Sequence, residues 1–228
     1  MFTHHFIRYC ITFVSLNFAF TAYAQLSQSA KLDTLNIDFM NRGYFYASQS
    51  EPYSHYNGWA VSKNLPHKVT VTLKDDFPLG IVIDTTQRPL FFKRYAGYRL
   101  FVVCNAGYGV TFNAQDSRLN MWLQALDSTG VWRDIDYLPN SSCGNSYHTL
   151  RLRAKERWDF VVPLYGGTYP TKVRAALSYV DPKDKNPRKF ERKEALVYSN
   201  AVLMKINPEQ FWRKLEYLPT DLMNTDNE

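Results

Sequence analysis

The sequence predicts an all-β protein: an antiparallel β-sandwich of the immunoglobulin-like or jelly-roll-like kind, with a short C-terminal helix. Two observations predict the sandwich. Apolar and polar residues alternate within many short runs, and turn residues separate these runs at intervals of roughly ten residues. In addition, no segment before the C-terminus has a helical repeat. A barrel is the second architecture that this pattern fits.

The first 24 residues have the order of features that is typical of a secretory signal peptide. One Arg and two His precede an apolar run, which ends in Ala22-Tyr23-Ala24. We therefore expect residues 1–24 to be a leader and the protein to be exported to the periplasm, the cell surface or the medium. The alternative is a buried N-terminal strand or helix. No later run has the length of a membrane-spanning helix, so no transmembrane segment is expected.

Residues 25–66 form an N-terminal arm that is polar and rich in tyrosine, and the alternating run 35–39 predicts one strand in it. The sandwich domain is expected at residues 67–206. It starts with the run 68–74, in which apolar residues alternate strictly with Lys and Thr. Further strands are expected at 79–85, 99–105, 109–114, 119–126, 131–138, 147–154, 158–164, 172–180 and 195–206.

Residues 207–228 are expected to form a helix followed by a loose tail. Asn207 is suited to be the N-cap, Pro208 the first helical residue and Gln210 the third. Apolar residues then recur on one face up to Pro219, namely Phe211, Leu215 and Leu218. We expect this helix to fold back over an open sheet edge. An exposed helix that binds a partner is the alternative.

Two cysteines follow the leader, and a disulfide between Cys104 and Cys143 is expected because exported proteins meet an oxidising compartment. It would close a loop of about 40 residues and stabilise the fold by about 4 kcal/mol in the chain-entropy model.

The stretch NSSCGNSYH, residues 140–148, could instead be a catalytic loop or a metal site. A thiol nucleophile at Cys143 needs a base in reach, but the alternation of the following run predicts that His148 is buried and hydrogen-bonded. The spacing of Cys and His shows none of the short pairs that build zinc sites, so no metal and no cofactor is predicted.

The most suggestive surface is on the hairpin predicted for residues 119–138. Ser128-Thr129-Gly130 suits a three-residue loop with Gly130 in the left-handed region, which places Asp127 opposite Val131. In that register Leu123 faces Ile135 and Met121 faces Tyr137 on the buried side. The side chains expected to point outward are Trp122, Gln124, Trp132, Asp134 and Asp136.

These five residues are the candidate ligand-binding site, because indole rings beside carboxylates and an amide suit the apolar face and the hydroxyls of a sugar. The alternative is that the arm or the C-terminal helix covers both tryptophans. Asp134 and Asp136 are poorly placed for glycoside hydrolysis, because two neighbours on one strand do not flank a bond.

The run TYPTKVRAALSYVDP, residues 168–182, and the run ALVYSNAVLMKI, residues 195–206, resemble the last two strands of immunoglobulin-like and fibronectin type III-like sandwiches. The matching residues are Val173-Arg174-Ala175 and Tyr198-Ser199-Asn200. In its general character the chain also resembles uncharacterised exported bacterial proteins.

The sequence therefore predicts an exported, non-catalytic β-sandwich with a binding or scaffolding role and no cofactor. A carbohydrate-binding module is the alternative. A net charge of +6 favours contact with anionic glycans or lipid headgroups, and the partner could be a glycan or another cell-envelope protein. Nucleic acid is not expected as a partner, since exported proteins seldom meet it.

Overall fold

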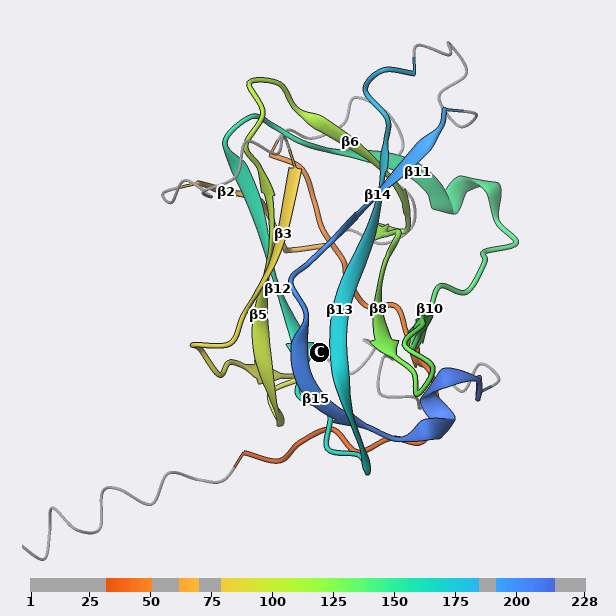
Figure 1. The fold of residues 1–228 in the computed structure, drawn as a ribbon. Helices are drawn as coiled ribbons and strands as arrows, with labels where there is room; N and C mark the ends of the chain where they lie inside the picture. Colours follow the sequence, from red (N-terminus) through yellow and green to blue (C-terminus); the bar gives the residue numbers. More distant parts are fainter. Residues whose placement is uncertain (1–31, 51–61, 70–78, 185–191, 216–228) are drawn as a thin grey trace, which may run out of the picture. The chain divides into compact units, whose positions relative to one another are not determined.

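The computed structural model describes residues 32–50, 62–69, 79–184 and 192–215. The unit Asp33–Glu228 is an antiparallel β-sandwich, which confirms the predicted fold class (Figure 1). The predicted leader and most of the strand expected at 68–74 lie outside the described residues. In the ranges that the structure describes, no helix is long and apolar enough to cross a membrane.

One large sheet is built on β5 (Tyr95–Cys104). This strand pairs antiparallel with β3 (Leu79–Asp84) on one side and with β12 (Glu156–Pro163) on the other. β2 (His67–Lys68) extends the sheet beyond β12, and β4 (Leu90–Phe91) pairs with the start of β5. Alternate residues of β3 are buried, as its sequence period predicts, because one face of the sheet covers the core.

The second large sheet is built on β13 (Tyr169–Val180), which pairs with β8 (Met121–Leu126). β9 (Trp132–Asp134) continues this sheet beyond β8. On its other side β13 pairs first with β15 (Val202–Ile206) and then with β14 (Glu194–Tyr198). The single strand expected at 195–206 is therefore two strands with a break between them.

Two smaller sheets complete the described fold. β6 (Val110–Gln115) pairs with β11 (Tyr147–Leu152) and with β7 (Arg118–Leu119). β1 (Asn41–Arg42) pairs in parallel with β10 (Asp136–Tyr137). The strand in the arm is thus β1 and not the run 35–39. That run forms only an isolated bridge, although its alternation is correct because Leu35 and Ile37 are both buried.

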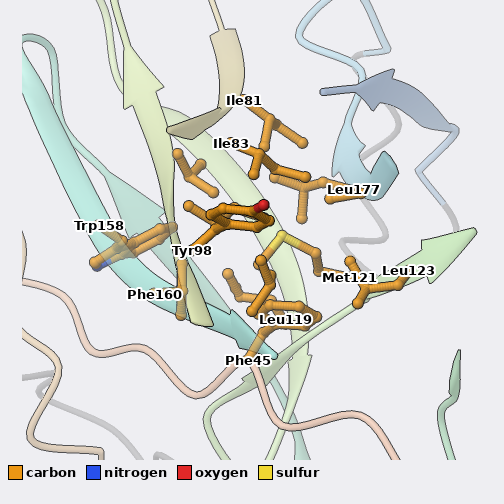
Figure 2. Packing of buried hydrophobic residues seen from close by; sticks show 14 of the residues in the cluster. Phe45, Ile81, Ile83, Tyr98, Leu119, Met121, Leu123, Trp158, Phe160 and Leu177 are labelled. Atoms are coloured by element: carbon orange, nitrogen blue, oxygen red, sulfur yellow. The ribbon is translucent and has the colours of Figure 1, made fainter. Parts of the chain in front are cut away.

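The inward faces of the two large sheets pack into one hydrophobic cluster (Figure 2). Ile81 and Tyr98 from the sheet of β5 point toward Met121 and Leu177 from the sheet of β13. The arm adds Phe45, which is fully buried and packs edge-on against Phe160 with 5.6 Å between the ring centroids. Residues from the arm are therefore part of the core.

The break between β14 and β15 is held by two side chains. The backbone N–H of Ile83 on β3 donates to Asn200 Oδ1 at 2.8 Å, and Asn200 Nδ2 donates to the Ile83 carbonyl at 3.0 Å. The backbone N–H of Ala175 donates to Ser199 Oγ at 2.8 Å. The side-chain amide of Asn200 therefore forms the two hydrogen bonds that a neighbouring strand would form with Ile83. In this way it joins the edge of the first sheet to the second sheet.

The predicted C-terminal helix is wrong in extent. Its start is as expected, since Asn207 caps a 3₁₀ turn, Pro208–Phe211, and the Asn207 N–H donates to Gln210 Oε1 at 3.1 Å. The helix ends there because the Arg213 carbonyl accepts a hydrogen bond from the Met40 N–H at 2.7 Å, and one isolated turn does not propagate. The expected helical residues from 216 onward lie outside the described residues.

The predicted disulfide is also wrong, because Cys104 and Cys143 remain thiols. Cys104 lies near Val110, at one end of the six-residue ladder between β6 and β11, and its thiol donates to the Tyr108 carbonyl at 3.3 Å. Cys143 lies at the other end, where its carbonyl binds the N–H of Ser146. A ladder of this length separates its ends by about 16 Å, and a disulfide needs Cα atoms within about 7 Å.

Asn200→Ala should lower the free energy of unfolding by about 2 kcal/mol, because it removes two hydrogen bonds and leaves the backbone of Ile83 without partners. Urea unfolding followed by circular dichroism measures this. Asn145→Ala, at an exposed position, is the matched control and should change stability little. An equal effect of both substitutions would contradict the role of Asn200.

Thiol labelling followed by peptide mass analysis should modify Cys143 in the native protein and Cys104 only after unfolding. Cys143 is half-buried, whereas Cys104 is fully buried and burial raises the pKa of its thiol. A peptide pair linked through the two cysteines under non-reducing conditions would contradict the structure.

Candidate functional site

The hairpin that carries the predicted site is organised by Asp127. Its Oδ1 accepts hydrogen bonds from the N–H and the hydroxyl of Thr129 and from the N–H of Val131, and its Oδ2 pairs with Arg133 at 2.6 Å. The Thr129 hydroxyl and Arg133 hold the pKa of Asp127 well below its ordinary value. Gly130 has φ of 81° and the backbone N–H of Asp127 donates to the Val131 carbonyl at 2.9 Å, so the predicted loop and the pairing of Asp127 with Val131 are confirmed.

On the outward face of this sheet, polar side chains bind one another in a chain. The indole N–H of Trp122 and the amide of Gln124 both donate to Asp134 Oδ1, at 2.8 and 2.9 Å. Arg174 on β13 donates from Nε to Gln124 Oε1 at 3.0 Å. This array is the cross-strand pairing of Asp134, Gln124 and Arg174 on three adjacent strands.

The guanidinium of Arg174 lies over two aromatic rings. Its central carbon is 4.2 Å from the centroid of the Trp132 ring and 3.9 Å from that of Tyr198. Both contacts have the geometry of cation–π interactions, and partial desolvation lowers the pKa of Arg174. We call the set Trp122, Gln124, Trp132, Asp134, Arg174 and Tyr198 the ladder face.

Four of the five predicted site residues belong to the ladder face. Trp122 and Trp132 are half-buried, and the cover over Trp132 comes from Arg174 of the same sheet. Sequence reasoning missed Arg174 and Tyr198, which lie in the runs that resemble fibronectin-type strands. Their contact with the hairpin depends on the pairing of β13 with β8 and β14, which no local pattern reveals.

Asp136 does not lie on this face, and its predicted outward position is wrong. Asp136 is 1% exposed. The pairing of Ile135 with Leu123 follows the predicted register, but the chain then leaves β8, and β10 pairs with β1 instead. The consecutive residues Ile135 and Asp136 are both buried, so the alternation ends there. The expected pairing of Tyr137 with Met121 is replaced by pairing of Tyr137 with Arg42 on β1.

Asp136 is the centre of a buried polar cluster. Its Oδ2 accepts from the Leu123 N–H at 3.0 Å, and its Oδ1 accepts from the Tyr165 hydroxyl at 3.3 Å. Burial raises the pKa of Asp136 to about 8, which the two hydrogen bonds only partly oppose. Burial also raises the pKa of Tyr165 and of Tyr44, whose hydroxyl lies near this carboxyl.

In the stretch 140–148, the ring of His148 is occupied by a hydrogen bond to the backbone. His148 is buried, as predicted, and its Nε2 accepts from the Ser117 N–H at 3.1 Å. Burial lowers the pKa of His148, so the ring is a neutral acceptor. Across the described residues, no group of three or more His, Cys, Asp or Glu side chains is arranged to hold a metal ion.

The other large sheet carries a groove on its outward face that sequence reasoning did not find. It has a volume of about 550 Å³. It lies over β3, β5 and β12, and nine residues line it: Val69, Val82, Asp84, Gln87, Arg99, Phe101, Val103, Arg157 and Asp159. The separate strands alternate as expected, but the hollow exists only once their outward residues are side by side.

Comparison with known proteins identifies no relatives: no protein-family model and no curated protein matches this chain. The function is therefore inferred from the outward faces of the two large sheets.

The contribution of Asp136 to stability should fall as the pH rises from about 4 to about 8, since an unfolded Asp titrates near 4 and Asp136 near 8. Between these values the folded state holds a proton on Asp136 that the unfolded state has lost, so this contribution falls by about 1.4 kcal/mol for each pH unit. His148, whose pKa is lowered by burial, contributes in the opposite direction below about 6.5.

Asp136→Asn should remove this part of the pH dependence, which urea unfolding at several pH values measures. Asp33→Asn, at an exposed position, should keep the slope of the unsubstituted protein. The same slope in the Asp136→Asn variant would contradict a buried, protonated carboxyl.

Proposed function

We propose that this chain is an exported, non-catalytic β-sandwich that binds a partner protein of the cell envelope through the ladder face. Export is supported by the leader-like pattern of residues 1–24. The observation that carries the binding role is the position of Arg174 between Trp132 and Tyr198, with its Nε bound to Gln124.

The composition of the ladder face supports a protein partner. Trp, Tyr and Arg are the residues that contribute most often to the energetic centres of protein interfaces. Here they are already ordered by hydrogen bonds and ring contacts, so their side chains lose little rotamer freedom on binding.

Exposed apolar residues continue the ladder face onto the neighbouring strands. Leu196 and Tyr198 on β14 are 48% and 42% exposed, and Leu203 on β15 is 76% exposed. Pairing places Leu203 beside Lys172, on the same side of the sheet as Arg174. The combination of an aromatic and arginine centre with apolar neighbours fits a protein surface better than a small ligand.

The hydrogen bonds of the ladder face support a binding role rather than a catalytic one. Asp134 accepts hydrogen bonds from Trp122 and Gln124, so its carboxylate is part of the structure of the face. Stacking of a sugar on Trp132 would have to displace Arg174 from the ring.

A photo-crosslinking residue placed at Leu203 should form an adduct with one cell-envelope protein in the native host. A crosslinker at Leu90 should form none, since Leu90 is also exposed, at 46%, but belongs to the other large sheet. Arg174→Ala and Tyr198→Ala should each reduce the adduct at Leu203 at least severalfold, while the unfolding midpoint shows that both variants remain folded.

Equal adducts at Leu203 and Leu90, or an adduct at Leu203 that survives both ladder substitutions, would contradict the proposal. A hydrolytic activity that disappears on Asp134→Ala or Cys143→Ala would overturn the non-catalytic assignment.

A further inference from the structure

We propose that the groove over β3, β5 and β12 is a second binding site, and that its ligand is a neutral pyranose unit of a glycan. The groove belongs to the sheet of β5 and shares no residue with the ladder face. The proposal is therefore independent of the proposed protein partner.

The register of the three strands places Phe101 at the centre of the groove. Phe101 pairs with Val82 on β3 and with Asp159 on β12, so these three outward side chains form the middle row. In the next row Val103 lies between Gly80 on β3 and Arg157 on β12. The floor is therefore apolar along β5 and at Val82, with Arg157 and Asp159 on the side of β12.

One end of the groove carries polar groups that are only partly occupied. Arg99 donates from Nε to Gln87 Oε1 at 3.1 Å and pairs across the strands with Asp84. Asp84 Oδ1 accepts two hydrogen bonds from Thr86. Among the described residues, these contacts leave the terminal nitrogens of Arg99, the amide nitrogen of Gln87 and Asp84 Oδ2 available to a ligand.

The side of the groove along β12 is formed by an ion pair that is partly shielded from solvent. Arg157 Nε lies 3.0 Å from Asp159 Oδ1, and the two side chains are 27% and 18% exposed. The guanidinium of Arg157 lies 4.9 Å from the centroid of the Phe101 ring. This pair is thus held in place by the floor of the groove.

The charges of the lining select a neutral ligand. Two arginines and two aspartates line the groove, so their formal charges cancel, and an anion gains no net attraction there. Donors from Arg99 and Gln87 stand beside an acceptor on Asp84, which matches hydroxyl groups that both donate and accept. Val82, beside the Phe101 ring that Arg157 contacts, supplies apolar surface for the carbon face of a sugar ring.

The size of the groove and the contacts of its two carboxylates indicate that it binds a glycan without cleaving it. Residues 99–103 span about 13 Å along β5, and β3 and β12 are about 10 Å apart, which is room for one or two sugar rings. Asp159 is paired with Arg157, and hydrogen bonds from Thr86 lower the pKa of Asp84. Neither carboxylate is prepared to act as the general acid of a glycosidase.

A glycan array that contains neutral and uronate-bearing oligosaccharides tests this site, followed by calorimetric titration of the neutral glycan that binds best. Arg99→Ala should weaken binding about tenfold, because a hydrogen bond from a charged group contributes about 1.4 kcal/mol or more. Val82→Arg should abolish binding by filling the groove from an outward strand position that tolerates a long side chain.

Trp132→Ala and Tyr198→Ala are the matched controls on the ladder face and should leave glycan binding unchanged. The unfolding midpoint of each variant establishes that the sandwich is intact. A preference for uronate-bearing glycans, an array without any bound glycan, or binding that is lost in Trp132→Ala and kept in Arg99→Ala would each overturn the proposal. None of these outcomes affects the crosslinking result at Leu203.

Discussion

The structure depends on how strand β13 shares one edge between two partners. β15 pairs with the first part of β13 and β14 with the second, and the chain has to leave the ladder between them. A backbone that leaves a ladder inside a protein loses hydrogen bonds, and unsatisfied buried groups destabilise a fold strongly. Ser199 restores the bonds of Ala175, and Asn200 reaches the other sheet to satisfy Ile83.

This junction also relates the two sheets to each other. Because Asn200 binds both the N–H and the carbonyl of Ile83, the edge of β3 is held against the end of β14. β3 contributes the Val82 and Asp84 side chains to the groove, and β14 contributes Tyr198 to the ladder face. The side chain of Asn200 therefore helps to position residues of both the groove and the ladder face.

The two outward surfaces differ in how completely their side chains satisfy one another. On the ladder face, the partners of Asp134 and Arg174 lie on three strands, so the side chains of this surface are ordered. The surface consists of aromatic rings and a guanidinium group. In the groove, Arg99 and Gln87 bind each other but retain unused donors above an apolar floor. An ordered surface suits another protein surface, whereas a hollow with unused donors and acceptors suits a small polyhydroxylated ligand.

Period-two alternation and turn residues were sufficient to predict most of the long strands from residue 79 onward, the loop at Gly130, the burial of His148 and the outward position of Trp122, because these depend on neighbours in the sequence. They did not predict β4 or the division of the runs 131–138 and 195–206 into two strands each. Only the tertiary structure decided the rest. Asp136 is buried because its strand leaves β8 for the arm, Cys104 and Cys143 are kept apart by a ladder between them, and the C-terminal turn ends where its backbone binds Met40. The groove and the contact of Arg174 with Tyr198 likewise arise from pairing between strands distant in sequence, and a local repeat holds no information about which strands will be neighbours.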